Sequence, residues 1–318
     1  AGVKKLYSSN IDDYTTILPV FSTGDLKKAK KIHPYMDKSI KKGSIVIQRH
    51  SMKIKRKEYC KWIDDSYLMV GKSYFYKGEF DEAIKIFSFI KNEYPKNEIR
   101  FVASLWLVRG FVEKGDLSSA ELELEDILKN KRFPDNLEQK VAVVAADYYV
   151  KKKNYLVAIE ELKNATKLIK RKRNKVRLNY ILAQLYQQSN NHTLAKKYYK
   201  LVLKSSPEYK MAFNAKMNLA RSLEIGDTDT KKMKSKLLKM TKDSKNKEYL
   251  DQIYFTLAEM DINSKDTMSA SKNYLLSTKN SVDNNSQKSL SFLALGKINF
   301  DRSLYKSAKT YYDSTLFY

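Results

Sequence analysis

The side chains best suited to chemistry are few in this chain and stand far apart. Its three histidines, His33, His50 and His192, could bind a metal or transfer a proton, but none has a partner at the spacing of metal ligands. The single cysteine, Cys60, cannot form an internal disulfide, and we expect it to pack at a loop or edge. The sequence also contains no phosphate-binding loop, zinc-protease helix motif or nucleophile elbow. We therefore predict no enzyme activity, no metal and no cofactor.

The recurring pattern of the chain is clearest between Asp64 and Pro95. Counted from Asp64 as position 1, bulky apolar residues stand at positions 4, 7, 11, 24 and 27, small residues at 8 and 20, and proline at 32. Bulky residues three and four positions apart lie on one face of a helix. The pattern resembles the tetratricopeptide repeat, which is a pair of antiparallel helices. Its residues here are Tyr67, Val70, Gly71, Tyr74, Ala83, Phe87, Ile90 and Pro95.

These positions have physical reasons. Two antiparallel helices approach closely only where both carry small side chains, here Gly71 and Ala83, and the bulky residues fill the space around that contact. The stretch 77–79 provides the turn between the two helices. Pro95 ends the second helix, because proline has no backbone N–H to donate.

The alanine at position 20 recurs along the chain and measures the period of the repeat. Successive alanines are 37, 38, 37, 75 and 38 residues apart, and 75 is two periods. Lys232 occupies the skipped position, so we expect a fifth repeat with an irregular second helix. Seven repeats result, each longer than the usual length of about 34 residues. The alanines are Ala83, Ala120, Ala158, Ala195, Ala270 and Ala308.

Stacked repeats of this kind predict an all-α, right-handed superhelical solenoid in which each repeat packs only on its neighbours. A hydrophobic fraction of 42%, with nine glycines and five prolines among 318 residues, agrees with a mostly helical chain. We assign residues 63–318 to the solenoid and expect it to be truncated at the C-terminus. Residues 25–62 are predicted to form a leading helical half-repeat that ends with the basic loop 53–57. Residues 1–24 are predicted to be an extended segment packed against the first helices.

Two residues set the expected bounds of the leading helix. Asp25 has the side chain of an N-cap residue, and Pro34 is expected to break or restart the helix before it continues to about His50. No apolar run approaches the roughly 20 residues of a membrane-spanning helix, and the first seven residues do not resemble a signal peptide. We therefore expect the chain to be cytoplasmic, or a processed piece of an exported protein.

The concave side of such a solenoid is its usual ligand surface, lined by positions 2, 5, 9, 12 and 13 of the first helix of each repeat. These positions are mixed in charge, with amides in the middle. They lack the set of lysine, asparagine and arginine that holds a C-terminal carboxylate in chaperone-binding relatives. We expect a segment of a partner protein to bind there. The predicted groove residues are Asp65, Lys72, Tyr76, Arg109, Lys140, Asp147, Arg177, Tyr180, Gln184, Gln187, Asn214 and Arg221.

The formal net charge of +25 is spread unevenly along the chain. Residues 151–177 contain eleven basic residues against two glutamates, including the run Lys170, Arg171, Lys172 and Arg173, which we expect at an edge of the solenoid. A lysine-rich surface that is simply solvated is one interpretation. Attraction to an acidic protein or to anionic lipid is a second. Nucleic acid is a third, although no recognition motif accompanies the charge.

Three stretches carry a resemblance to a more specific family. They are residues 47–52 (IQRHSM), 63–72 (IDDSYLMVGK) and 311–316 (YYDSTL). They are similar to the tetratricopeptide lipoproteins of Bacteroidetes called SprE in gliding species and PorW in others, and the resemblance spans most of the chain. It implies a protein held at the periplasmic face of the outer membrane by a lipid. The anchor is expected upstream of this chain, because no lipobox precedes Cys60.

The resemblance also implies a function. Members of that family are required for type IX protein secretion and gliding motility, as scaffolds that connect the outer-membrane translocon to ring and motor components. The expected partners are therefore proteins, without nucleic acid or a small-molecule ligand. Thr267 and Ser314 lie in short motifs of the kind that carries O-glycans in periplasmic proteins of that phylum. One alternative is a cytoplasmic adaptor that binds nucleic acid or an acidic partner through the basic edge, and another is a regulatory module of an enzyme.

Overall fold

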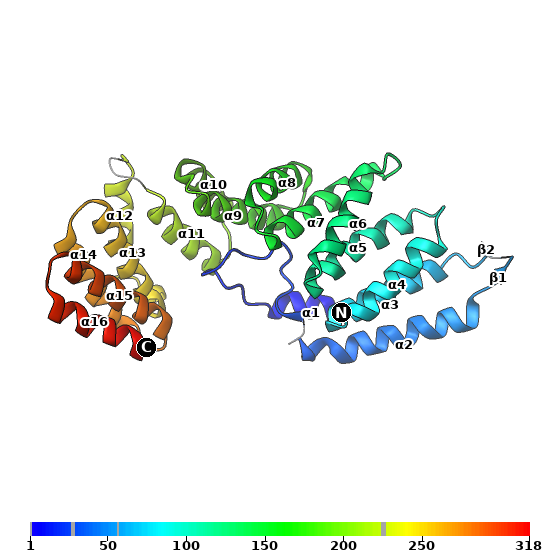
Figure 1. Cartoon of the computed structure of the whole chain (residues 1–318), viewed down its shortest axis with the longest axis horizontal. Helices are drawn as coiled ribbons and strands as arrows, with labels where there is room; N and C mark the ends of the chain where they lie inside the picture. Colours follow the sequence, from blue (N-terminus) through cyan, green and yellow to red (C-terminus); the bar gives the residue numbers. More distant parts are fainter. Residues whose placement is uncertain (1, 27–28, 56, 224–226) are drawn as a thin grey trace. The chain divides into compact units, whose positions relative to one another are not determined.

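The computed structural model of the chain is helical through most of its length (Figure 1). The chain divides into two compact units, Ala1–Leu185 and Tyr186–Tyr318, and each is described by itself. The all-α class predicted from the periodicity is confirmed. The structure describes residues 2–26, 29–55, 57–223 and 227–318.

The first unit contains three complete helix pairs, α3 with α4, α5 with α6 and α7 with α8, at the places of the first three predicted repeats. α9 begins in this unit and ends in the second. The helices are α1 (Gly2–Ser9), η2 (Lys30–Ile32), α2 (His33–His50), α3 (Ile63–Lys77), α4 (Phe80–Glu93), α5 (Ile99–Lys114), α6 (Leu117–Lys129), η3 (Asp135–Leu137), α7 (Glu138–Lys151), α8 (Tyr155–Leu168) and α9 (Lys172–Gln188).

The second unit contains the second helix of the fourth repeat and the fifth to seventh pairs. All of them lie where the alanine spacing predicts them. The helices are α10 (His192–Lys204), α11 (Tyr209–Arg221), α12 (Thr230–Met240), η4 (Ser244–Tyr249), α13 (Leu250–Asn263), α14 (Thr267–Asn280), α15 (Asn285–Asp301) and α16 (Tyr305–Phe317).

The close approach of paired helices occurs at the predicted small residues. A Cβ atom added to Gly71 would lie 2.6 Å from Cε1 of Phe87, and one added to Gly296 would lie 2.5 Å from Cε1 of Tyr312. The six position-20 alanines are all buried. Lys232, at the same position of the fifth repeat, is exposed, and α12 has only 11 residues. The fifth repeat is therefore present, but its second helix is short and continuous rather than irregular.

The turn inside most repeats has the same two features. The first helix ends at a residue with positive φ, which is Gly78 (80°) or Gly115 (93°) in the first two repeats and a non-glycine residue in most later ones. In the second, third, fourth and sixth repeats the second helix then begins after an Asp or Asn whose side chain accepts a backbone N–H three residues on, as Asp116 does from Ser119 at 3.1 Å. Asp266 does the same from Ser269. These caps fix where the second helix starts, and thus which face it buries. The residues before α4, α12 and α16 form no such bond.

The N-terminal region differs from its prediction. Gly2–Ser9 forms a helix, α1, where an extended segment was expected, and only the residues after it are irregular. Asp25 does not begin a long helix: α2 begins at His33, with Pro34 in its first turn, where proline needs no N–H partner. Lys27 and Lys28 lie outside the described residues.

The expected basic loop contains a short hairpin. Lys53–Ile54 (β1) pairs antiparallel with Lys57–Glu58 (β2) before α3 begins. The carboxylate of Glu58 accepts the N–H groups of Met52 and Cys60, each at 2.9 Å, and so closes the turn. Arg56 lies outside the described residues. This ribbon contains the only strands in the described part of the chain.

Candidate functional site

The predicted groove of the first unit is occupied by the protein's own chain. Residues 10–22, here called the N-terminal segment, leave α1 and run past α7 and α9 before the chain enters α2 (Figure 1). They contact α5, α7 and α9 through side chains of the predicted groove. From here on, "the groove" means this surface, formed by Arg109, Asp147, Arg177, Tyr180 and Gln184.

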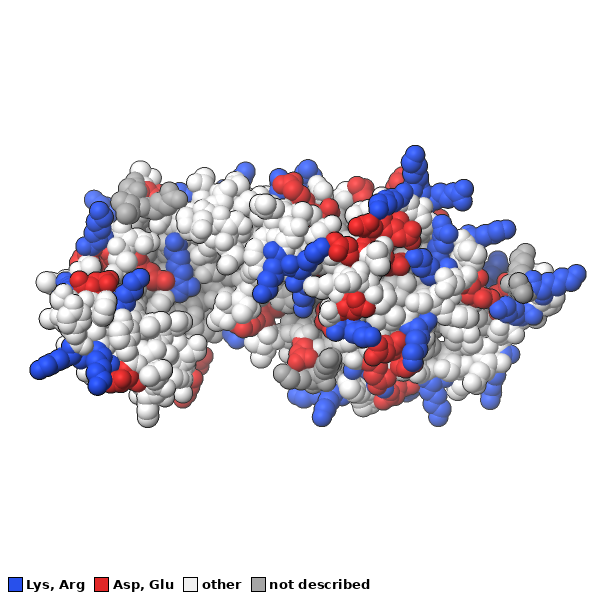
Figure 2. Space-filling model, in the orientation of Figure 1, with Lys and Arg blue, Asp and Glu red and all other residues white. Residues whose placement is uncertain are grey.

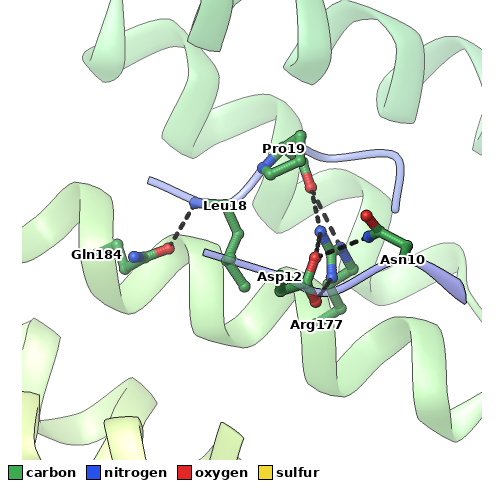
Figure 3. Close-up of polar contacts among 6 residues, drawn as sticks. All are labelled: Asn10, Asp12, Leu18, Pro19, Arg177 and Gln184. Atoms are coloured by element: carbon green, nitrogen blue, oxygen red, sulfur yellow. Dashed lines mark hydrogen bonds and ion pairs between the residues drawn. The ribbon is translucent and has the colours of Figure 1, made fainter. Parts of the chain in front are cut away.

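Arg177 on α9 holds the segment at two points (Figure 3). Its Nε and Nη2 donate to the carbonyl oxygen of Pro19 at 3.1 and 2.9 Å. Its Nη1 and Nη2 also donate to the two carboxylate oxygens of Asp12, at 2.5 and 3.0 Å. The side chains of this ion pair are only 12% and 11% exposed, so water screens it little. Asn10 donates to Asp12 as well, at 3.2 Å.

Gln184, two helical turns further along α9, contacts the backbone of the segment. Its Oε1 accepts the N–H of Leu18 at 2.9 Å, and its Nε2 donates to the carbonyl oxygen of Thr16 at 2.7 Å. One side-chain amide therefore satisfies two backbone groups of an extended chain, as a neighbouring β-strand would. Leu18 itself is 0% exposed. Between these contacts, Tyr14 meets Tyr180 edge to face, with ring centroids 5.4 Å apart.

Arg109 and Asp147 hold the end of the segment. The guanidinium of Arg109 on α5 lies 3.9 Å from the ring centroid of Phe21 and 4.2 Å from that of Trp106. The buried carboxylate of Asp147 on α7 accepts the backbone N–H of Val20. Burial, and then the nearby charge of Glu113, raise the pKa of Asp147 to about 7.

An open pocket of about 370 Å³ adjoins the end of the segment. Its wall combines Phe21 and Trp106 with the cations Lys72, Arg109 and Lys140, and it includes no carboxylate. Burial lowers the pKa of Lys72, and the neighbouring ammonium of Lys140 lowers it further. The pocket is thus a small, positively charged extension of the groove.

The remaining predicted groove residues are not part of these contacts. Asp65 is exposed on α3, and Tyr76 lies beside Tyr7 of α1. In the second unit, three residues have partners of their own. Gln187 accepts the Tyr199 hydroxyl at 2.8 Å, Asn214 donates to the carbonyl of Lys210 at 2.9 Å, and Arg221 pairs with Glu259 at 2.6 Å.

The sequence did not indicate which segment lies in the groove. The cluster 17–21 was expected to pack on the first helices, but nothing local links it to α9, which lies more than 150 residues away in sequence. In the structure, buried Leu18 and Val20 alternate with partly exposed neighbours, but residues 17–21 are all apolar, so the sequence itself shows no alternation there.

The residues of the predicted basic edge lie on the surface. Lys170, Arg171, Lys172 and Arg173 are all exposed, at the turn before α9 and in its first residues. No carboxylate of the described residues forms an ion pair with them. On the face drawn in Figure 2, lysines and arginines are otherwise interspersed with carboxylates.

The two proposed glycosylation residues lie in helices. Thr267 is the first residue of α14 and accepts a hydrogen bond from Arg302 at 2.9 Å. Ser314 lies within α16 and donates to the carbonyl of Thr310 at 2.9 Å. Among the described residues, no group of three or more His, Cys, Asp or Glu side chains could hold a metal ion. No described helix is both long enough and apolar enough to span a membrane.

Comparisons with known proteins agree with this architecture. Tetratricopeptide-repeat models match residues 65–97 and residues 176–209. The apo form of RapI is similar in structure, with a TM-score of 0.55 and 16% identity over 80% of this chain and 76% of RapI. The C-terminal part of a TPR repeat-containing protein from Cytophaga hutchinsonii has a TM-score of 0.56 and 15% identity, over 82% of this chain and 97% of that one.

At such identities these two likenesses show the fold alone. No curated protein matches the chain in sequence. Solenoids of this kind typically serve as scaffolds that bind protein partners on extended surfaces. The chain is therefore built of tetratricopeptide repeats and has the fold of a protein-binding scaffold.

Proposed function

We propose that the chain is a non-catalytic scaffold whose first unit binds an extended segment of a protein in the groove. One observation carries this proposal: residues 12–21 of the chain itself lie there, and Arg177 and Gln184 contact their backbone. A surface that satisfies the N–H and C=O groups of an extended chain accepts peptides as a class. Leu18 and Asp12 add side-chain selectivity for an apolar and an acidic residue.

We further propose that this scaffold works in type IX protein secretion and gliding motility, at the periplasmic face of the outer membrane. The support is the resemblance of residues 47–52, 63–72 and 311–316 to the SprE and PorW lipoproteins. In this proposal a lipid anchor precedes the chain, and its partners are the outer-membrane translocon and the ring and motor components. O-glycans on Thr267 and Ser314 belong to the same proposal, and the intact mass of native protein tests them.

A peptide test examines the groove directly. Leu18→Asp places a carboxylate in a fully buried site, so the N-terminal segment should leave the groove. A fluorescent peptide of residues 10–23 should then bind the Leu18→Asp chain in trans, with fluorescence anisotropy as the measurement. Wild-type chain, whose groove is filled, should bind it at least about tenfold more weakly.

Two controls make the result specific. The same peptide with aspartate in place of Leu18 should not bind. Adding Tyr180→Ala and Gln184→Ala to the Leu18→Asp chain should weaken binding about tenfold or more, which corresponds to the loss of roughly 1.4 kcal/mol. If the peptide binds neither chain, the groove is a structural contact and not a peptide site.

A pull-down tests the cellular proposal. Tagged full-length protein should be purified from gently solubilised membranes, and its companions identified by mass spectrometry. Translocon and ring components that are lost with Tyr180→Ala and Gln184→Ala would support both parts of the proposal. Recovery from the soluble fraction with unrelated proteins would contradict the secretion role.

The run Lys170–Arg173 is exposed and forms no ion pair with a described carboxylate, which favours one alternative, an adaptor for nucleic acid or an acidic partner. That alternative predicts binding of RNA or DNA whose affinity falls steeply with salt, and whose loss follows replacement of these four residues by glutamine. Binding that ignores these substitutions would contradict it.

A further inference from the structure

The fifth repeat leaves an open cleft in the second unit. In the other repeats a small residue at position 20 lets the two helices touch, but in α12 that position is occupied by Lys232, which is exposed and lines a cleft. The space that a closed pair would fill is a cleft of about 760 Å³ between α10, α11 and α12. Its floor is apolar and consists of Leu203, Leu219, Leu223, Met233, Leu237 and Met240.

Lysines line both walls of this cleft. Lys200 and Lys204 stand one helical turn apart on α10, and Lys232, Lys236 and Lys239 follow one another on successive turns of α12. Lysine side chains of this kind lie along an apolar surface and leave the ammonium in water. The cleft is therefore an apolar channel with a row of positive charge on each side.

These charges are not balanced within the described part of the chain. The one carboxylate in the lining, Asp229, pairs with Lys200 at 2.5 Å. Among the described residues, no carboxylate forms an ion pair with Lys204, Lys232, Lys236 or Lys239. Like charges brought this close repel one another, so an anionic occupant would remove a repulsion as well as cover apolar surface.

The shape of the charge selects among anionic occupants. Two rows of lysines along an apolar floor match a helix with an apolar stripe and carboxylates on both sides of it. A helix about as long as the 11-residue α12 reaches along the full wall. A single-chain lipid carries its charge at one end, and would leave most of these lysines unmatched. A nucleic-acid strand would place phosphates along the rows, but it offers no apolar stripe for Leu203 and Met240.

We propose that the cleft between α10, α11 and α12 is a docking site for an acidic amphipathic helix of a partner protein. The apolar stripe of that helix lies on Leu203, Ala212 and Met240, which are partly exposed in the cleft, and its flanking carboxylates meet the lysines of α10 and α12. This site lies wholly in the second unit, and it does not depend on the groove of the first.

The test uses the full chain and a pair of synthetic helical peptides. The acidic probe has leucines at positions i, i+3, i+4 and i+7 with glutamates on both sides of that stripe, and its partner has lysine at every glutamate position. Fluorescence anisotropy should show the acidic peptide binding at least about tenfold more tightly than the basic one, with an affinity that falls as salt is added. Equal binding of the two peptides would overturn the proposal.

Variants locate the site. Lys232→Glu with Lys236→Glu should weaken the acidic peptide about tenfold or more, whereas Lys297→Glu with Lys309→Glu changes the net charge equally on exposed residues of α15 and α16 and should leave affinity unchanged. Ala212→Trp fills the cleft without any change of charge and should also weaken binding. Circular dichroism checks that each variant is folded. If the Lys232→Glu, Lys236→Glu chain is not folded, Lys232→Gln with Lys236→Gln is used in its place.

Other ligands decide between occupants. Equal loss of affinity in the two charge-reversed pairs would mean that the peptide binds through net charge alone, which would overturn the site. Oleate and a short oligonucleotide are tested in the same way. If one of them binds the wild-type chain but not the Lys232→Glu, Lys236→Glu chain, and the acidic peptide does not bind at all, the cleft is a site for that ligand and the proposal of a helical partner is wrong.

Discussion

The groove of the first unit and the cleft of the second unit both carry cations, but they differ in what balances them. In the groove, Arg177 is held by Asp12 and two carbonyl contacts, and Arg109 lies on an aromatic ring. In the cleft, Lys232, Lys236 and Lys239 of α12 form no ion pair with a described carboxylate. The groove is thus a binding surface whose polar groups already have partners within the chain. The cleft is a binding surface whose charges have no partners among the described residues. The contacts of the groove are specific and shielded from water, whereas the lysines of the cleft act together as a diffuse positive field.

The largest effect on stability is expected from a substitution that breaks the shielded ion pair of the groove. Arg177→Ala leaves the carboxylate of Asp12 and the carbonyl of Pro19 without their donor in a mostly buried place. The free energy of unfolding of the first unit should fall by roughly 3 to 5 kcal/mol. Both tryptophans, Trp62 and Trp106, lie in this unit, so urea unfolding followed by tryptophan fluorescence measures it.

The matched change in the second unit is Lys200→Ala, which breaks its ion pair with Asp229. Those side chains are about half exposed, so the unfolding free energy should change by less than about 1 kcal/mol. A similar loss in both variants would mean that the groove pair is no better shielded than the cleft pair.

The second effect concerns pH and the groove. The pKa of Asp147 is about 7 in the folded chain, well above its ordinary value, so folding binds a proton between these two values. The stability that this proton brings is complete below the ordinary pKa and is lost as the pH rises through 7. Wild-type protein should therefore lose about 2 to 3 kcal/mol between pH 5 and pH 8 relative to Asp147→Asn, which keeps an acceptor for the N–H of Val20.

Urea unfolding of both proteins at the two pH values measures this difference through the same tryptophans. Other groups titrate equally in the two proteins and cancel in the comparison. Identical pH profiles would show that Asp147 is ionised in the groove, held by Arg109 and Lys151.

The third effect tests the closed helix pairs against the open one. Ala195→Leu puts three extra carbons into a fully buried helix contact and should lower the stability of the second unit by about 1 to 3 kcal/mol. Because this unit contains no tryptophan, hydrogen exchange of α10 is the measurement. Unchanged protection would mean that the helices can separate there without cost.

The smallest effect comes from the same position of the open pair. Lys232→Ala restores the small residue of the other repeats, but the lysine is exposed and makes no ion pair with a described carboxylate. Stability should change by less than about 0.5 kcal/mol, while binding of the acidic peptide should weaken. A large gain in stability would show that the lysine is what holds the pair open.

Sequence periodicity predicted the helix pairs because their register depends on local residue types. The alanines of position 20 lie where the helices touch, and Lys232 marked the repeat whose second helix is short. The helix caps were also readable, since Asp116 and Asp266 stand directly before their helices. α1 was missed, because its eight residues carry too little pattern to separate a helix from an extended segment.

The sequence predicted residues that line the groove but not the segment that lies in it. The positions that face the groove follow from helix geometry, and Arg109, Asp147, Arg177, Tyr180 and Gln184 all lie there. The occupant could not be predicted, because its contacts join residues more than 150 positions apart and depend on backbone groups that every residue carries. Sequence alone does not indicate which extended stretch such a surface will take.

The contacts of Gln184 have a consequence for how this region can evolve. They fall on the backbone at Thr16 and Leu18, so they are indifferent to the side chains of the segment at those points. Asp13, Thr15 and Thr16 are exposed and can drift among relatives without loss of the contact, whereas Asp12 and Leu18 cannot. Diverged homologues should therefore preserve only an acidic residue followed six positions later by an apolar residue, and not a continuous sequence motif.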